Sequence, residues 1–161
     1  MSEPQQNNQP VFSIEKVFVK DLSLEIPNAP QIFTEQVQPQ LEVQIATEVA
    51  KFAETYFEVT VSATVTAKSG ERTVFLVEAV QAGIFSISNV PPQELDPLLS
   101  VGCPTILFPY LRETISDIVT RGGFPPVLLS PVSFEALYMQ RQQQQAGAGQ
   151  PQGGSQIEIA R

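Results

Sequence analysis

The chain has 161 residues, a formal net charge of −8 and a sequence pI of about 4.4, and its nine basic residues are scattered. Phosphate binding depends on clustered Lys and Arg, so nucleic acid is not an expected partner. There is no histidine, which removes the commonest general base and metal ligand. The single cysteine excludes an internal disulfide framework, and the length favours one domain.

The first ten residues are polar, rich in Gln and Asn, and predicted to be disordered. They lack the basic and apolar regions of a secretory signal. No apolar run in the sequence approaches the ~18 residues of a membrane span. We therefore expect a cytoplasmic protein that does not insert directly into a membrane.

Residues 11–26 alternate as a strand does. One predicted face carries Phe12, Ile14, Phe18, Leu22, Leu24 and Ile26, and the other carries Ser13, Glu15, Asp21, Ser23 and Glu25. Val17 and Val19 break this alternation, which indicates either a bulge or a change of neighbouring strand in the middle of the strand. Pro27 and Pro30 end the strand because proline cannot donate to the ladder.

Three more strands are expected, at about 41–45, 57–67 and 73–87. The turn Lys68–Glu71 predicts that the last two form an antiparallel hairpin. Residues 73–87 are largely apolar on both faces, which one layer of helices would not require. We therefore expect a second cover, favouring a subunit interface over another part of the chain.

After the strands the pattern changes to helix. Apolar residues spaced by three and four predict an amphipathic helix from about Phe108 to Arg121, with residues 103–107 as an approach segment, because Pro109 belongs in a first turn. Gly122 and Gly123 can end it. Ser133 is a plausible N-cap for a last helix, and residues 140–161 form a Gln- and Gly-rich segment predicted to be flexible.

The sequence offers little chemistry, and no catalytic set, cofactor or metal site is expected. Cys103 is more simply a buried small residue than a nucleophile, and Asp21 with Glu25 are more simply solvated than an acid–base pair. Several loop and terminal residues are unexpectedly apolar: Ile32, Phe33, Phe124, Phe134, Tyr138 and Met139. They either pack on the helix or form an exposed groove for an unfolded partner.

Several blocks, in order, resemble one family. They are Lys20-Asp21, Pro27-Asn28-Ala29-Pro30, Gly83-Ile84-Phe85-Ser86-Ile87, the run Cys103–Glu113, and Pro131–Leu137. From about Val11 to Gln145 the chain resembles SecB, the bacterial protein-export chaperone. The resemblance implies an α+β fold, in which a four-stranded antiparallel sheet has helices on one side, assembled as a homotetramer, a dimer of dimers.

It also implies function: an ATP-independent holdase, not an enzyme, that keeps precursor proteins unfolded and delivers them to the SecA translocation ATPase. The implied SecA-binding residues are Asp21, Glu25, Leu76 and Glu78. The implied contacts between dimers are Val77, Ala79 and Gln81. The implied client-binding groove carries Leu24, Ile26, Ile32, Phe33, Phe134, Leu137 and Tyr138.

The chain also departs from the family pattern. Val37 stands where the family often has a tryptophan beside the groove, and the segment after Gln140 contains only Glu158 as an acid, whereas the family's tail is commonly acidic. The expected division is a disordered N-terminus at 1–10, a chaperone domain at 11–139 and a tail at 140–161. Two alternatives remain: a SecB-like chaperone with non-secretory clients or one that controls an antitoxin, and a small-ligand carrier or enzyme.

Overall fold

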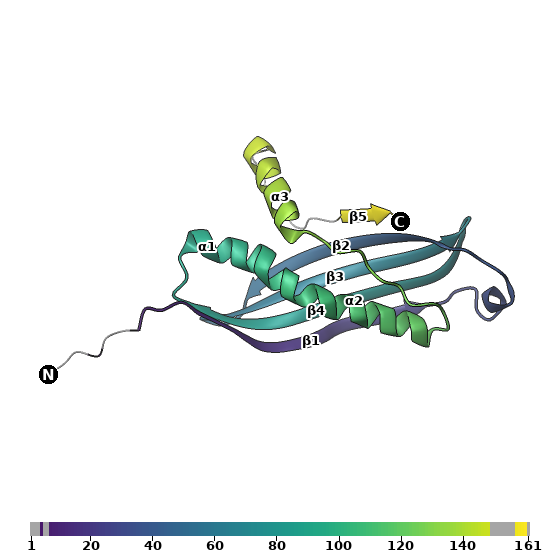
Figure 1. The fold of residues 1–161 in the computed structure, drawn as a ribbon, viewed down its shortest axis with the longest axis horizontal. Helices are drawn as coiled ribbons and strands as arrows, with labels where there is room; N and C mark the ends of the chain where they lie inside the picture. The colour runs from purple at the N-terminus through teal and green to yellow at the C-terminus, as the bar shows by residue number, and fades with distance from the viewer. Residues whose placement is uncertain (1–3, 5–6, 149–156, 161) are drawn as a thin grey trace.

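The fold is a single antiparallel sheet with helices on one side (Figure 1). The structure is a computed structural model and describes residues 4, 7–148 and 157–160. The strands are β1 (Val11–Glu25), β2 (Gln40–Lys51), β3 (Tyr56–Ser69), β4 (Arg72–Ser88) and β5 (Ile157–Ala160), in the spatial order β1-β4-β3-β2-β5. The predicted α+β class, with a four-stranded antiparallel sheet and helices on one side, is confirmed, and β5 adds a short fifth strand.

The helical segments are η1 (Gln31–Thr34), α1 (Pro92–Pro97), η2 (Leu98–Gly102), α2 (Cys103–Arg121) and α3 (Phe134–Ala148). The prediction that 103–107 only approach the main helix is wrong. The backbone is already helical at Gly102, with φ −63° and ψ −51°, and Pro104 lies in the first turn, where a missing N–H costs nothing. Pro109 lies inside the helix, and Gly123, with φ +91°, follows its end.

Strand β1 changes its alternation twice. Its register against β4 shifts between Ile14 and Lys16 and again between Val19 and Asp21. Directly opposed residues of an antiparallel pair lie on the same face. The two bulges therefore bring Val17 and Val19 to the helix-bearing face and Phe18 to the opposite, outer face. The predicted bulge is confirmed, and the placement of Phe18 with Phe12 is wrong.

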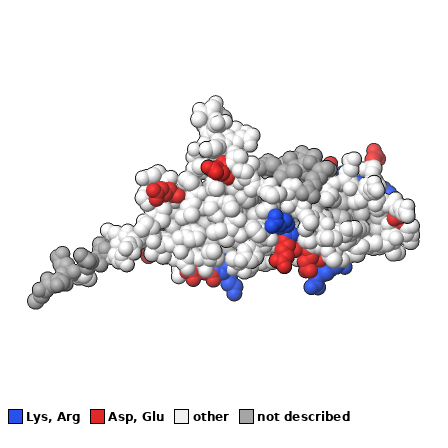
Figure 2. All heavy atoms as spheres, in the orientation of Figure 1, with Lys and Arg blue, Asp and Glu red and all other residues white. Residues whose placement is uncertain are grey.

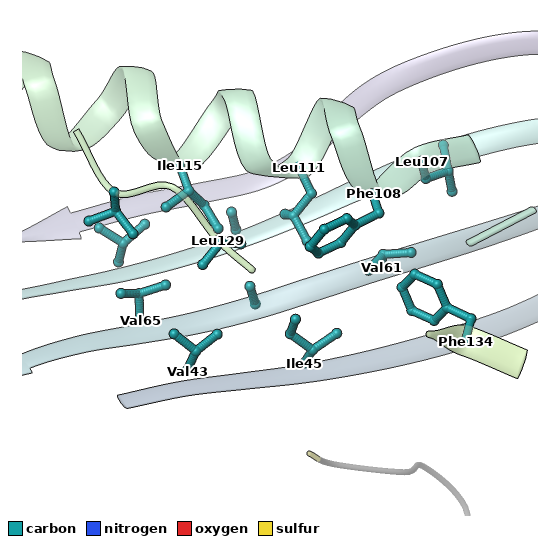
Figure 3. Close-up of a cluster of buried hydrophobic side chains, with 14 of the residues drawn as sticks. Val43, Ile45, Val61, Val65, Leu107, Phe108, Leu111, Ile115, Leu129 and Phe134 are labelled. Carbon is teal, nitrogen blue, oxygen red and sulfur yellow. The ribbon is translucent and has the colours of Figure 1, made fainter. Parts of the chain in front are cut away.

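Helix α2 crosses the sheet over β4 and β3 and buries at least one side chain in each turn (Figure 3). The buried side chains that repeat every four residues are Leu107, Leu111, Ile115 and Val119. They meet apolar side chains that alternate along the strands, including Val43, Ile45, Val61 and Val65. The core forms where the apolar stripe of the helix, which repeats every 3.6 residues, packs on strands whose apolar side chains occur at every second residue.

Gly83 permits the close approach of α2 to β4. A Cβ built at this position would lie 2.9 Å from a Leu107 methyl carbon and 2.8 Å from the Phe85 ring. No real side chain tolerates both contacts without movement of the helix or the ring. The absence of a side chain at Gly83 thus sets the spacing between helix and sheet.

The structure differs from the predicted flexible segment at 140–161 in two places. Helix α3 continues to Ala148, and Ile157–Ala160 pair with β2. Residues 149–156 and 161 lie outside the described residues, as do 1–3, 5 and 6 of the N-terminal segment. Residues 7–10 have no regular secondary structure, and the Asn89 side-chain amide donates to the Gln9 carbonyl at 3.1 Å.

Replacing Leu111 with alanine should destabilise the fold by about 2–5 kcal/mol, because a fully buried side chain is lost and a cavity remains. The matched control is Tyr110→Ala in the same helix turn, where the ring is 49% exposed; its cost should stay below about 1 kcal/mol. Urea unfolding followed by circular dichroism measures both. Equal losses would contradict the packing of α2 described above.

Candidate functional site: an acidic outer face and an apolar helix-bearing face

Four predicted residues meet on the outer face of the sheet. Glu25 lies directly opposite Leu76, and Asp21 is opposite Val80, while Glu78 is opposite the intervening Ser23. The three carboxylates are exposed and Leu76 is half-buried. We call Asp21, Glu25, Glu78 and Leu76 the outer acidic patch. Among the described residues none of its carboxylates forms an ion pair, so the patch keeps its negative charge.

The loop after β1 is tied to the β3–β4 turn by polar contacts. The Asn28 side-chain amide donates to the Thr73 carbonyl at 2.9 Å, and the Arg72 guanidinium forms an ion pair with the Glu35 carboxylate. The hydrogen bond from Arg72 lowers the pKa of the exposed Glu35 carboxyl. These contacts hold the 27–39 segment at the end of the sheet where α2 finishes.

Phenylalanine side chains gather beneath that loop. The Phe124 ring lies 5.1 Å from the Phe33 ring and 4.9 Å from the Phe75 ring, measured between centroids. Phe33 is 48% exposed, whereas Ile32 is only 2% exposed and belongs to the core. The remaining two predicted groove residues at this end, Leu24 and Ile26, lie against Gly122 at the end of α2.

The other predicted groove residues lie near the start of α2. Phe134 is 2% exposed and packs edge-on against Phe108, with ring centroids 5.9 Å apart. Leu137 is half-buried. The Tyr138 hydroxyl donates to the Asp96 carboxylate at 2.7 Å, which raises the pKa of Tyr138.

The seven predicted groove residues therefore form two groups at opposite ends of α2. Ile32 and Phe134 are core residues of this chain, each at 2% exposure, and the client-binding role predicted for all seven residues stays a prediction. The prediction treated these residues as one surface because sequence spacing carries no information about which end of the sheet a loop reaches.

An apolar hollow that the sequence did not reveal lies between the two groups. The extended segment after Phe124 runs back beside β2 (Figure 1). The hollow is lined by Leu41, Val43, Ile45, Val127, Leu128, Leu129 and Ser130, and we call it the β2 hollow. Leu128 is 62% exposed at its rim. The only signal in the sequence was a run of three apolar residues, Val127 to Leu129, between prolines, and it does not show which of them are covered.

The charge distribution separates the two faces. Figure 2 views the molecule from the side that carries α2, and charged side chains are sparse there. The outer acidic patch belongs to the opposite face of the sheet. The helix-bearing side therefore offers apolar contact between scattered charges, and the outer side carries the outer acidic patch.

The residues predicted at the contact between dimers are buried within this chain. Val77, Ala79 and Gln81 are at most 3% exposed and face α2. The Gln81 side-chain amide donates to the Phe18 carbonyl at 3.1 Å, and its oxygen accepts from the Thr114 hydroxyl at 3.2 Å. Helix α2 occupies the face toward which they point, so within this chain they contact the helix, and their role at a contact between dimers stays a prediction.

The structure gives no support to a reactive centre at Cys103. Its side chain is fully buried, and burial raises the pKa of the thiol to about 12. Within the described residues no group of three or more His, Cys, Asp or Glu side chains is placed to hold a metal ion. Asp21 and Glu25 lie on the open outer face and are not enclosed in a cleft.

Comparison with known proteins agrees with this arrangement. Residues 5–145 match the family model described as preprotein translocase subunit SecB. The chain belongs to the SecB family. Protein-export protein SecB of Chromobacterium violaceum is 60% identical over 149 residues, covering 92% of this chain and 99% of that protein. The SecB of Nitrosomonas eutropha is 61% identical over 153 residues, covering 94% of each chain.

A solved structure shares the SecB fold at much lower identity. A SecB-like chaperone of Mycobacterium tuberculosis, in complex with a peptide from an antitoxin, has a TM-score of 0.58 and 19% identity. The match covers 75% of this chain and 90% of that one. Among the described helices of the present SecB chain, none is both long and apolar enough to cross a membrane.

The buried Cys103 thiol should resist alkylation. With a pKa of about 12, only about one thiol in ten thousand is ionised at pH 8, and the side chain has no exposed surface. Labelling by iodoacetamide should be at least about 100-fold slower in buffer than in 6 M guanidinium chloride, where the thiol is free. Mass spectrometry of timed samples measures both rates. Similar rates would show an accessible, reactive cysteine.

Proposed function

We propose that this SecB chain is an ATP-independent holdase that keeps precursor proteins unfolded in the cytoplasm and delivers them to the SecA translocation ATPase. The observation that carries the proposal is family membership together with 60% identity to a protein-export SecB over nearly its whole length. Since the two relatives at about 60% identity are named as export proteins, whereas the antitoxin-bound SecB-like chaperone is only 19% identical, export is favoured over antitoxin control or ligand transport.

The helix-bearing face supports the client-binding half of the proposal. An unfolded protein presents short apolar stretches in extended conformation, with backbone groups that need partners. The phenylalanine rings at Phe33 and Phe124 and the exposed Leu128 offer apolar contact area without directional chemistry. Each 100 Å² of apolar surface buried there contributes about 2.5 kcal/mol before the cost of ordering the client. Such binding needs no nucleotide.

The outer acidic patch supports the delivery half. Unpaired carboxylates on an exposed strand surface attract a basic partner and speed its association, and salt weakens the attraction. Leu76 supplies an apolar contact in the middle of the patch. Because clients and SecA would use opposite sides of the sheet, both can be bound at once.

For the proposed homotetramer, a dimer of dimers, strand β1 offers a contact surface. This strand forms one edge of the sheet, and edge strands carry unpaired backbone groups. Its exposed apolar residues are Val11, Phe12, Ile14, Val19 and Leu22, each between 37% and 46% exposed. We propose that a second subunit covers these side chains, in addition to the contact predicted at Val77, Ala79 and Gln81.

Refolding of a denatured secretory precursor tests the holdase activity. With stoichiometric protein and no nucleotide, the yield of refolded precursor should fall strongly, because binding of the unfolded state competes with folding. Intrinsic fluorescence of the precursor measures the yield. Addition to the already folded precursor should have no effect. Unchanged refolding would contradict the proposal.

Charge reversal tests the two surfaces separately. Asp21→Lys combined with Glu25→Lys should weaken SecA binding at least about tenfold, since attraction becomes repulsion, and leave client binding within about twofold. The matched control is Glu94→Lys with Glu113→Lys, the same charge change in helices on the other side of the sheet. Titration calorimetry measures both. Equal loss of SecA and client binding in the first variant would contradict separate surfaces.

A further inference from the structure

Strand β5 covers the edge of the sheet that β2 would otherwise expose. In the spatial order of strands, β2 lies between β3 and β5. The paired residues are Glu42 with Ala160, Val43 with Ile159, Gln44 with Glu158 and Ile45 with Ile157. Without β5, this side of β2 would present a row of unpaired N–H and C=O groups, which is a template for another extended chain.

The stretch of β2 that β5 covers is also the stretch that borders the β2 hollow. Val43 and Ile45 line the hollow and also pair with Ile159 and Ile157. The sequence Ile-Glu-Ile-Ala alternates as a half-buried strand does. The segment therefore offers this edge what an extended apolar peptide would offer: backbone partners and apolar residues at every second position.

We propose that the edge of β2 at Glu42–Ile45 binds extended apolar client segments by strand addition, and that Ile157–Ala160 of the same chain occupies this edge when no client is present. The tail segment then acts as an intramolecular competitor. The inference rests on the proposed function, because the competing ligand is an unfolded client.

The length of β2 determines which clients displace the tail. Pairing with β5 ends at Ile45, but β2 continues to Lys51, and Val49 beyond the pairing is 43% exposed. A four-residue strand binds weakly, but its tether gives it an effective concentration in the millimolar range. Long apolar segments, which can pair along the whole strand, displace it, whereas short or polar ones do not. The tail thus raises the apparent Kd by the inverse of the fraction of molecules whose edge is free.

Removal of the competitor is the first test. The probe is fluorescently labelled lysozyme, reduced and carboxamidomethylated so that it stays unfolded. Deletion of residues 157–161, or Ile157→Ser with Ile159→Ser, should tighten its binding by about three- to tenfold. The control Glu158→Ser changes the same segment without removing either isoleucine and should leave the Kd within about twofold.

The second test is a reducible disulfide that holds Ile157–Ala160 on the edge of β2. Gln44→Cys with Glu158→Cys places two thiols at directly opposed positions, where the Cα separation of about 4.5–5.5 Å suits a disulfide. The control pair is Glu48→Cys with Glu158→Cys, four residues further along β2 and outside the pairing. Cys103 is buried and can remain. The first pair should oxidise preferentially, weaken probe binding by at least about tenfold and recover on reduction.

The outcomes separate the two proposals. Equal probe affinity in the intact, tail-deleted and locked proteins would overturn the competitor while leaving the holdase standing. Preferential cross-linking of the control pair would overturn the placement of the tail. Failure of every variant to bind the probe, the tail-deleted one included, would overturn the proposed function and this inference with it.

Discussion

The packing of α2 on the sheet is the contact on which the rest of the molecule depends. Four side chains at successive turns of α2 are fully buried against β4 and β3, and the approach is close because Gly83 has no side chain. Helix α2 therefore covers one face of β4. The other face remains open, and it carries the exposed carboxylates. The distinction between an apolar side and an acidic side follows from which face α2 covers.

The two bulges of β1 determine which of its side chains lie on the helix-bearing face and which lie on the outer face. A regular strand with the sequence of β1 would place Val17 and Val19 on the same side as Asp21 and Glu25. The register shifts turn the four residues from Lys16 to Val19 over, so that both valines lie on the helix-bearing face and the acids stay on the outer face. Bulges at a sheet edge also increase the local twist of the strand.

The chemistry of the chain is that of a binding protein. Its only thiol is buried with a raised pKa, and its distinctive surfaces are apolar rings, the sheet edge at β1 and acids that form no ion pair with any residue the structure describes. Surfaces of this kind recognise general features of a partner: apolar content, extended backbone and net charge. Breadth of recognition is what a holdase requires. In the proposed scheme, competition from Ile157–Ala160 adds a threshold that only long apolar clients exceed.

Much of the architecture could be predicted from the amino-acid sequence alone. Alternation identified the four long strands, and the Lys68–Glu71 turn identified the hairpin. The spacing of apolar residues identified the main helix, and the breaks at Val17 and Val19 indicated a bulge. These features are local: they depend on the period of side chains along one element and on residues that end it. The grouping of Asp21 and Glu25 with Leu76 and Glu78 came from the family resemblance, and the β1–β4 register agrees with it.

Only the tertiary structure decided the relation between elements. In it Val77, Ala79 and Gln81 lie beneath α2, and Ile32 and Phe134 are core. Val127–Leu129 line a hollow beside β2, and Ile157–Ala160 pair with the edge of that strand. An apolar residue has the same sequence signature whether a helix, a loop or a partner covers it, so its exposure is set by long-range packing that no local pattern encodes.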